Sequence, residues 1–172
     1  MGERWSAEFG EFYNANRDAC LRAVLASTAG QRVAEDLVAE AFARAWASWP
    51  KVRRHPAPRA WVVRTALNTG VSRWRKQRRE QPLADEEVAA TEAANDRMDT
   101  SLLAALRRLP ERQREVVALR VFLDLDTAGT ATALGIAPGT VTAHLSRAIA
   151  TLRHELDPAD PSLMTPRPTA TR

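Results

Sequence analysis

Apolar residues recur every three or four positions in four separate segments, and this spacing restricts the fold more than any other feature. The segments cover residues 8–26, 33–49, 59–79 and 102–156. Side chains spaced in this way share one face of an α-helix. Alternating runs of β-branched residues, which would indicate strands, are missing from the sequence, and Gly is scarce at 7 of 172 residues. The sequence therefore predicts an all-α protein.

The distribution of polar stretches divides the chain into two small helical domains. We expect the first domain to span residues 6–79 and the second residues 101–156. The stretch between them, 80–100, carries seven acidic residues and one Arg without apolar periodicity, which is typical of a flexible acidic linker. The tail, 157–172, holds four Pro and is expected to be disordered.

Positive charge is concentrated just before this acidic stretch. The formal net charge is only +4, but residues 51–79 contain ten Lys or Arg and no Asp or Glu. Because Lys and Arg neutralise the phosphates of nucleic acids, such a block predicts an anion-binding surface.

The helix predicted within this basic block has an unusual outward face, where Trp61 lies among Arg64, Asn68 and Ser72. Arg can hold a phosphate, Asn can contact a base edge, and Trp can stack on an unpaired base. The pattern thus indicates a nucleic-acid surface. The alternative for Trp61 is that its indole folds back and only covers the core.

Ala131, Gly135 and Val141 have the offsets of a helix-turn-helix. A small residue lets two helices approach, a Gly permits the tight turn, and an apolar residue anchors the second helix. Asp126 can cap the first helix and Pro138 suits the first turn of the second. The exposed face of that second helix would carry Thr140, Thr142, Ala143, His144 and Arg147. For His144 alone, an ordinary exposed histidine is the simpler interpretation.

Several classes of function find no support in the residues. Cys20 is the only cysteine and the three His are scattered, so neither a disulfide nor a metal site is predicted. We find no Gly-rich phosphate loop and no nucleophile paired with a base, so we expect no cofactor and no enzymatic activity. The N-terminus lacks the apolar stretch of a signal peptide, and no apolar run approaches the roughly 18 residues of a membrane span. A cytoplasmic protein without membrane insertion is expected.

Taken together, these segments resemble extracytoplasmic-function sigma factors of bacterial RNA polymerase. Residues 34–46, AEDLVAEAFARAW, resemble region 2.2 of that family, and residues 59–64, RAWVVR, with Asn68 and residues 72–75, SRWR, resemble regions 2.3 and 2.4. Residues 109–116, LPERQREV, and Gly139-Thr140-Val141 are similar to regions 4.1 and 4.2. Asp124-Leu125 and Thr130-Ala131 further resemble an actinobacterial branch.

The resemblance implies a protein that carries core RNA polymerase to promoter DNA. Region 2.2 would dock on the β′ clamp helices through Asp36, Glu40 and Arg44. Regions 2.3 and 2.4, with the loop before them, would melt and bind the −10 element through Arg53, Arg54, His55, Arg59, Trp61, Arg64, Asn68, Ser72 and Arg75. Region 4 would contact the β flap and the −35 element, the latter through Arg112, Arg114, Thr140, Thr142, His144 and Arg147. An anti-sigma factor is a further partner that the family implies.

The sequence also departs from the family pattern. Ala39 stands where Gln is frequent, Ser72 where Asp is common, and Ala128 and Gly129 where a Glu pair is usual. Thr142 and His144 replace basic residues of the recognition helix, which should weaken −35 binding and reduce its salt dependence. Two alternatives therefore stay open: a stand-alone helix-turn-helix regulator, and a degenerate sigma-like protein that binds polymerase without promoter DNA.

Overall fold

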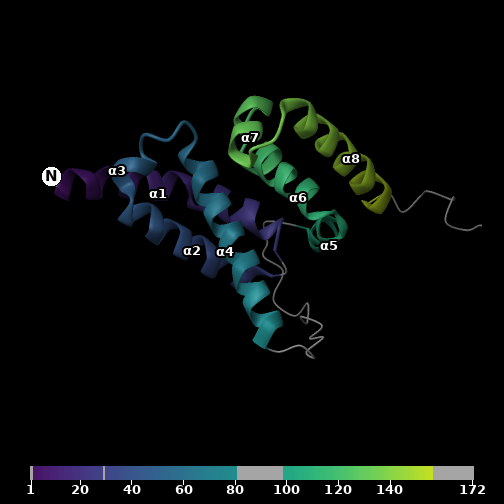
Figure 1. Cartoon of the computed structure of the whole chain (residues 1–172), viewed down its shortest axis with the longest axis horizontal. Helices are drawn as coiled ribbons and strands as arrows, with labels where there is room; N and C mark the ends of the chain where they lie inside the picture. The colour runs from purple at the N-terminus through teal and green to yellow at the C-terminus, as the bar shows by residue number, and fades with distance from the viewer. Residues whose placement is uncertain (1, 29, 81–98, 157–172) are drawn as a thin grey trace, which may run out of the picture.

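The computed structural model describes residues 2–28, 30–80 and 99–156, and these ranges form helices joined by short turns, without a strand (Figure 1). The all-α prediction is confirmed. The first group of helices consists of α1 (Gly2–Leu25), α2 (Gln31–Ala47), α3 (Trp49–Val52) and α4 (Pro58–Glu80). The second consists of α5 (Thr100–Arg108), α6 (Glu111–Val117), the π-helix η1 (Ala118–Phe122), α7 (Thr127–Leu134) and α8 (Pro138–Leu156). The predicted disordered tail and most of the predicted linker lie outside the described residues.

Aromatic packing fixes the first group of helices. The Phe9 ring of α1 lies 5.1 Å from the Trp49 ring, and the Tyr13 ring lies 4.9 Å from the Phe42 ring of α2. Chain direction changes between α2 and α3, where Pro50 occupies the first turn of α3. Apolar spacing in residues 33–49 predicts that Trp46 shares one buried stripe with Val38, Phe42, Ala45 and Trp49. The structure differs at Trp46, which is 46% exposed.

The second group contains the predicted helix-turn-helix in α7 and α8. The Asp126 side chain accepts a hydrogen bond of 2.6 Å from the Gly129 amide, so it caps α7 as predicted. Gly135 ends α7 in the left-handed conformation with φ of 66°, and α8 begins at Pro138. Ala131 and Val141 are buried at 5% and 0% exposure and hold the two helices together.

Replacing Gly135 by Ala is expected to lower the free energy of unfolding by roughly 1–2 kcal/mol, because an L-residue resists this positive φ. No other atom lies within 4 Å of a Cβ added at Gly135, so the cost is conformational rather than steric. Gly139→Ala is the matched control, since its added Cβ also meets nothing and its helical backbone suits Ala. Urea unfolding should show opposite shifts for the two variants. Equal shifts would contradict the role of the turn.

The two groups of helices share one core. A single cluster of buried side chains contains Val24 of α1, Val63 of α4, Leu119 of η1 and Ala133 of α7. The main helix contacts between the groups are α1 with η1 and α4 with α7. Figure 1 shows the two groups lying next to each other. Small buried residues at the end of α1 permit close approach of neighbouring helices: Cys20 and Ala23, with Ala26 in the turn that follows. Apolar packing thus sets the arrangement of the two groups.

Cys20 lies in the middle of this core. Its side chain has no exposed surface, and its Sγ lies 4.0 Å from the Arg59 carbonyl oxygen, to which it donates. Burial raises the pKa of the Cys20 thiol to about 12, and the positive charge of Arg59 opposes that rise. The thiol is therefore protonated at neutral pH.

Candidate nucleic-acid interface

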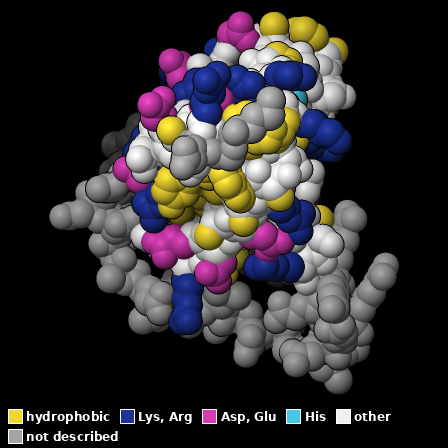
Figure 2. Space-filling view, turned by 90° about the vertical axis from the view of Figure 1, so that its left-hand side faces the viewer, with side chains coloured by type: hydrophobic (Ala, Val, Ile, Leu, Met, Phe, Trp, Pro, Cys, Tyr) yellow, Lys and Arg dark blue, Asp and Glu magenta, His cyan; other side chains and the backbone are white. Residues whose placement is uncertain are grey.

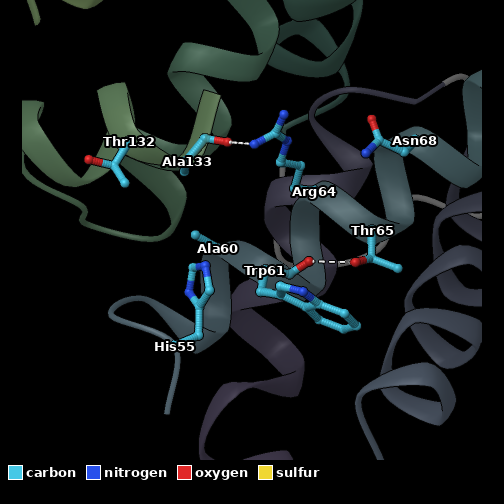
Figure 3. A pocket seen from close by; sticks show the side chains of 8 residues that line it. All are labelled: His55, Ala60, Trp61, Arg64, Thr65, Asn68, Thr132 and Ala133. Carbon is cyan, nitrogen blue, oxygen red and sulfur yellow. Dashed lines mark hydrogen bonds between the residues drawn. The ribbon is translucent and has the colours of Figure 1, made fainter. Parts of the chain in front are cut away.

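The outward face of α4 carries the predicted nucleic-acid residues. Arg64 and Asn68 are exposed, and Trp61 is half-buried because its indole packs against the core. Trp61 therefore fits both interpretations made from the sequence, since it covers the core and is also partly exposed. A pocket of about 250 Å³ opens here (Figure 3). Its lining residues come from the 55–68 stretch and from α7: His55, Ala60, Trp61, Arg64, Thr65, Asn68, Thr132 and Ala133.

Arg64 connects this face to the second group of helices. Its Nη1 donates a hydrogen bond to the carbonyl oxygen of Ala133 near the end of α7 (Figure 3). The guanidinium thereby satisfies one of the carbonyls that a helix end leaves without a backbone partner. In this arrangement α7 covers one side of the α4 face.

The segment before α4 is held by specific contacts. Arg53 Nε lies 2.8 Å from Glu8 Oε1, and His55 Nδ1 accepts a hydrogen bond of 3.0 Å from the Ala57 amide. Arg54 is exposed, whereas Arg59 is half-buried. Ser72 is exposed further along α4, and the side chain of Arg75 lies outside the described residues. The structure therefore brings the loop and the start of α4 to one region of the surface.

A second, wider groove runs between α2 and α4, with a volume of about 640 Å³. Its lining residues are Glu40, Arg44, Ala47, Ser48, Trp61, Thr65, Asn68, Thr69, Ser72 and Arg73. Glu40 and Arg44, which the sequence assigned to polymerase docking with Asp36, thus line a groove that does not include Asp36. Arg73 was missed by the sequence analysis, and it contacts Glu40 across 33 positions of the chain.

The predicted recognition helix α8 presents an exposed polar face. Thr140, Thr142 and Arg147 are exposed, and His144 is half-buried with no partner for its Nδ1. Two arginines of α6 differ from each other in their surroundings. Arg112 is exposed and lies 2.8 Å from Glu115, whereas Arg114 Nη1 donates to the Arg107 carbonyl at 2.8 Å and so fastens α6 to α5.

The described residues, 2–28, 30–80 and 99–156, were considered for membrane-spanning helices and for metal-binding groups. None of their helices is long and apolar enough to cross a membrane. They also contain no group of His, Cys, Asp and Glu side chains that could hold a metal ion.

The sequence matches two family models whose positions agree with this arrangement. Sigma-70 region 2 matches residues 12–80, and Sigma-70, region 4 matches residues 99–152. The chain belongs to the sigma-70 family of RNA polymerase sigma factors.

Individual relatives show to which subgroup of the sigma-70 family the chain belongs. RNA polymerase sigma-E factor of Streptomyces coelicolor is 34% identical over 159 residues, which cover 91% of this chain and 89% of the relative. The ECF sigma factor SigL of Mycobacterium tuberculosis is 32% identical over 151 residues, covering 82% and 84%. The chain is an extracytoplasmic-function sigma factor of actinobacterial type, which confirms the resemblance stated from the sequence.

Solved structures support the fold. RpoE of Bartonella quintana, in a complex with the anti-sigma factor NepR, is similar with a TM-score of 0.75 and 26% identity, covering 89% of this chain and 99% of that one. CnrH, in a complex with the cytosolic domain of CnrY, shares the fold with a TM-score of 0.65 at 22% identity, covering 90% and 91%.

Proposed function

We propose that the protein binds core RNA polymerase and directs it to promoters by recognising −35 and −10 elements and helping to open the DNA. The observation that carries this function is the presence of two separate polar faces, on α4 and on α8, in one sigma-70 chain. RNA synthesis itself belongs to the polymerase, so the work of this chain is binding. Because its proposed partners, RNA polymerase and promoter DNA, are cytoplasmic, the protein is expected to act in the cytoplasm.

The proposed order of events begins at the −35 element. Thr140, Thr142, His144 and Arg147 of α8 hold the major groove, with Arg112 near a phosphate. The α4 face then captures the non-template strand at −10. Unstacking costs a few kcal/mol per base, and stacking on an aromatic side chain returns about 1–3 kcal/mol per base. Trp61 is the proposed stacking platform, and residues 53–55 receive a flipped base.

The proposed domains follow the sequence boundaries. Residues 6–79 form the region 2 domain and 101–156 the region 4 domain, while 80–100 is a linker and 157–172 a tail. Asp36 on α2 docks on the β′ clamp helices, with Glu40 and Arg44 beside it, and region 4 touches the β flap. RpoE of Bartonella quintana is bound to the anti-sigma factor NepR, which supports an anti-sigma partner for this chain too.

Run-off transcription with core enzyme and a library of genomic promoters tests the function. Specific initiation that depends on the added protein is the expected result. Binding of duplex DNA in the absence of polymerase would instead favour a stand-alone helix-turn-helix regulator. Core binding without initiation at any promoter would favour a degenerate sigma-like protein.

Arg147→Ala is expected to weaken promoter binding by the holoenzyme to a similar degree at different promoter sequences. Base edges are contacted by the N-terminal residues of a recognition helix, and Arg147 lies beyond the first two turns of α8, where a guanidinium contacts phosphate. The slope of log K against log salt should become less negative by about 0.9, the value for one phosphate contact on duplex DNA. Titration of labelled duplex promoter at several salt concentrations measures both. A loss confined to one −35 sequence would show base readout instead.

A further inference from the structure

We propose that the packed arrangement of the two groups of helices in Figure 1 is a closed, resting form of the protein, in which α7 is held against the α4 face. The two groups separate when the protein engages a promoter. The inference rests on the proposed function and adds a conformational step to it. Three observations carry it: a polar contact between α4 and α7, the short distance between the α4 and α8 faces, and the shared apolar core.

The polar contact involves a residue of the proposed −10 face. Arg64 Nη1 donates a hydrogen bond to the Ala133 carbonyl oxygen of α7 (Figure 3). Thr132, also on α7, lines the pocket of about 250 Å³ together with Trp61. A strand that approaches Trp61 and Arg64 from this side meets α7, and its phosphate competes with the carbonyl for an N–H group of the guanidinium. The −10 face is therefore only partly available in the closed form.

The α4 and α8 faces are too close together in the closed form to reach both promoter elements. Helix α7 contacts both α4 and α8. Axes of packed helices lie about 8–10 Å apart, so one intervening helix keeps the two faces within about 20–40 Å of each other. The −35 and −10 elements are about 25 base pairs apart, or about 85 Å of duplex at roughly 3.4 Å per base pair. Binding both elements at once therefore requires a more open form.

The connection between the groups permits such a separation. Residues 81–99 lie between α4 and α5. An extended chain spans at most about 3.3–3.6 Å per residue, so this stretch can bridge roughly 60 Å. Added to the dimensions of the two groups, that reach covers the distance between the elements. Each group can therefore keep its own fold while the groups move apart.

Apolar burial holds the closed form together until a partner binds. The groups meet through α1 with η1 and α4 with α7, and Val63 of α4 and Leu119 of η1 belong to one buried cluster. Separation exposes part of this cluster to water, so the open form is rare in the free chain. A partner that binds only the open form shifts the equilibrium toward it. Promoter DNA that is contacted at both elements is such a partner.

Core polymerase can dock before the groups separate. Helix α2, which carries the proposed docking residue Asp36, makes its main contacts with α1, α3 and α4 of its own group. Asp36 is exposed in the closed form. Docking on core polymerase therefore leaves the α4–α7 contact intact, whereas contact with both promoter elements breaks it. The resulting order is core capture first and separation on promoter DNA second.

A pair of cysteines across the pocket reports whether the groups are together. Thr65 of α4 and Thr132 of α7 both line the pocket of about 250 Å³, and neither is a proposed binding residue. In a chain with Thr65→Cys and Thr132→Cys, a short, cleavable, bifunctional thiol reagent should cross-link the pair readily without polymerase. Core polymerase and promoter DNA together should slow the cross-linking at least about 10-fold. Cys20 is fully buried and does not compete for the reagent.

Arg108→Cys combined with Glu155→Cys is the matched control. The two native side chains form a salt bridge between α5 and α8 of the second group, so this pair should cross-link equally well in the free chain and in the complex. A monofunctional thiol reagent measures the access to each cysteine, which separates loss of proximity from shielding by polymerase or DNA. Equal cross-linking of the α4–α7 pair in both states would overturn the inference. No cross-linking of that pair in the free chain, while the control pair reacts, would also overturn it.

The cross-linked chain tests whether separation is required. It should bind core polymerase, because Asp36 stays exposed, but form open complexes at less than about a tenth of the unaltered rate. Reductive cleavage of the cross-link should restore the rate, and loss of core binding would contradict the proposed order. Open complexes formed by the cross-linked chain at the unaltered rate would overturn the inference while leaving the sigma function intact. If the chain initiates at no promoter even without the cross-link, the proposed function itself fails.

Discussion

Leu119→Ala is expected to lower the free energy of unfolding by about 2–5 kcal/mol, as observed for leucines removed from well-packed cores. The Leu119 side chain is 1% exposed and lies in η1, the element of the second helix group that packs on α1. The substitution removes apolar contacts and leaves a cavity in the core that both groups share. We therefore expect loss of stability in both groups together, measured as one urea transition followed by tryptophan fluorescence and by circular dichroism.

Val121→Ala supplies the control for this experiment. Val121 lies in the same π-helix but is 59% exposed, so its substitution should change the free energy of unfolding by less than about 0.5 kcal/mol. Two separate transitions, with only the second group affected by Leu119→Ala, would show that the groups fold independently and that the shared core contributes little.

Trp61→Leu is expected to slow open-complex formation by about 5- to 150-fold, which corresponds to loss of about 1–3 kcal/mol of stacking on one base. Trp61 lines both the pocket beside α7 and the groove beside α2, so it is the one aromatic side chain common to the two sites among the described residues. Leu keeps apolar cover over the core but cannot stack. A fluorescent base analogue in the −10 element reports the opening rate.

Trp61→Phe is the paired variant, because it keeps an aromatic face and should retain most of the opening rate. Binding of core polymerase should be similar for the Leu and Phe variants. Equal loss of core binding and opening in Trp61→Leu would assign Trp61 a purely structural role.

The helices and their caps could be predicted because their causes are local. Apolar spacing gave α2 and α8, the Asp126 carboxylate three residues before Gly129 gave the cap of α7, and Gly135 gave the left-handed turn. The candidate residues on α4 and α8 were accessible to the same reasoning, since a helix places residues three and four apart on one face. Their roles in DNA binding remain predictions.

The remaining features depend on packing between segments that are distant in the chain. Nothing near Arg64 in the sequence indicates that its guanidinium would meet Ala133, 69 positions away. The Glu40–Arg73 contact and the joining of two helix groups into one core have the same origin. Trp46 was misplaced because apolar spacing predicts which residues share a face but not how wide the buried strip is, and Trp46 lies at its margin.

Cys20 can serve as a natural probe of local opening in the folded protein. Cys20 is fully buried in the shared core and, with its pKa raised to about 12, stays a thiol at neutral pH. Thiol reagents attack the thiolate and need access, so labelling must wait for an opening event. Since the sequence holds no other cysteine, labelling of the unaltered chain reports that opening with no engineered site added. When reclosing is faster than the reaction the labelling rate gives the population of the open state, and when the reaction is faster it gives the opening rate.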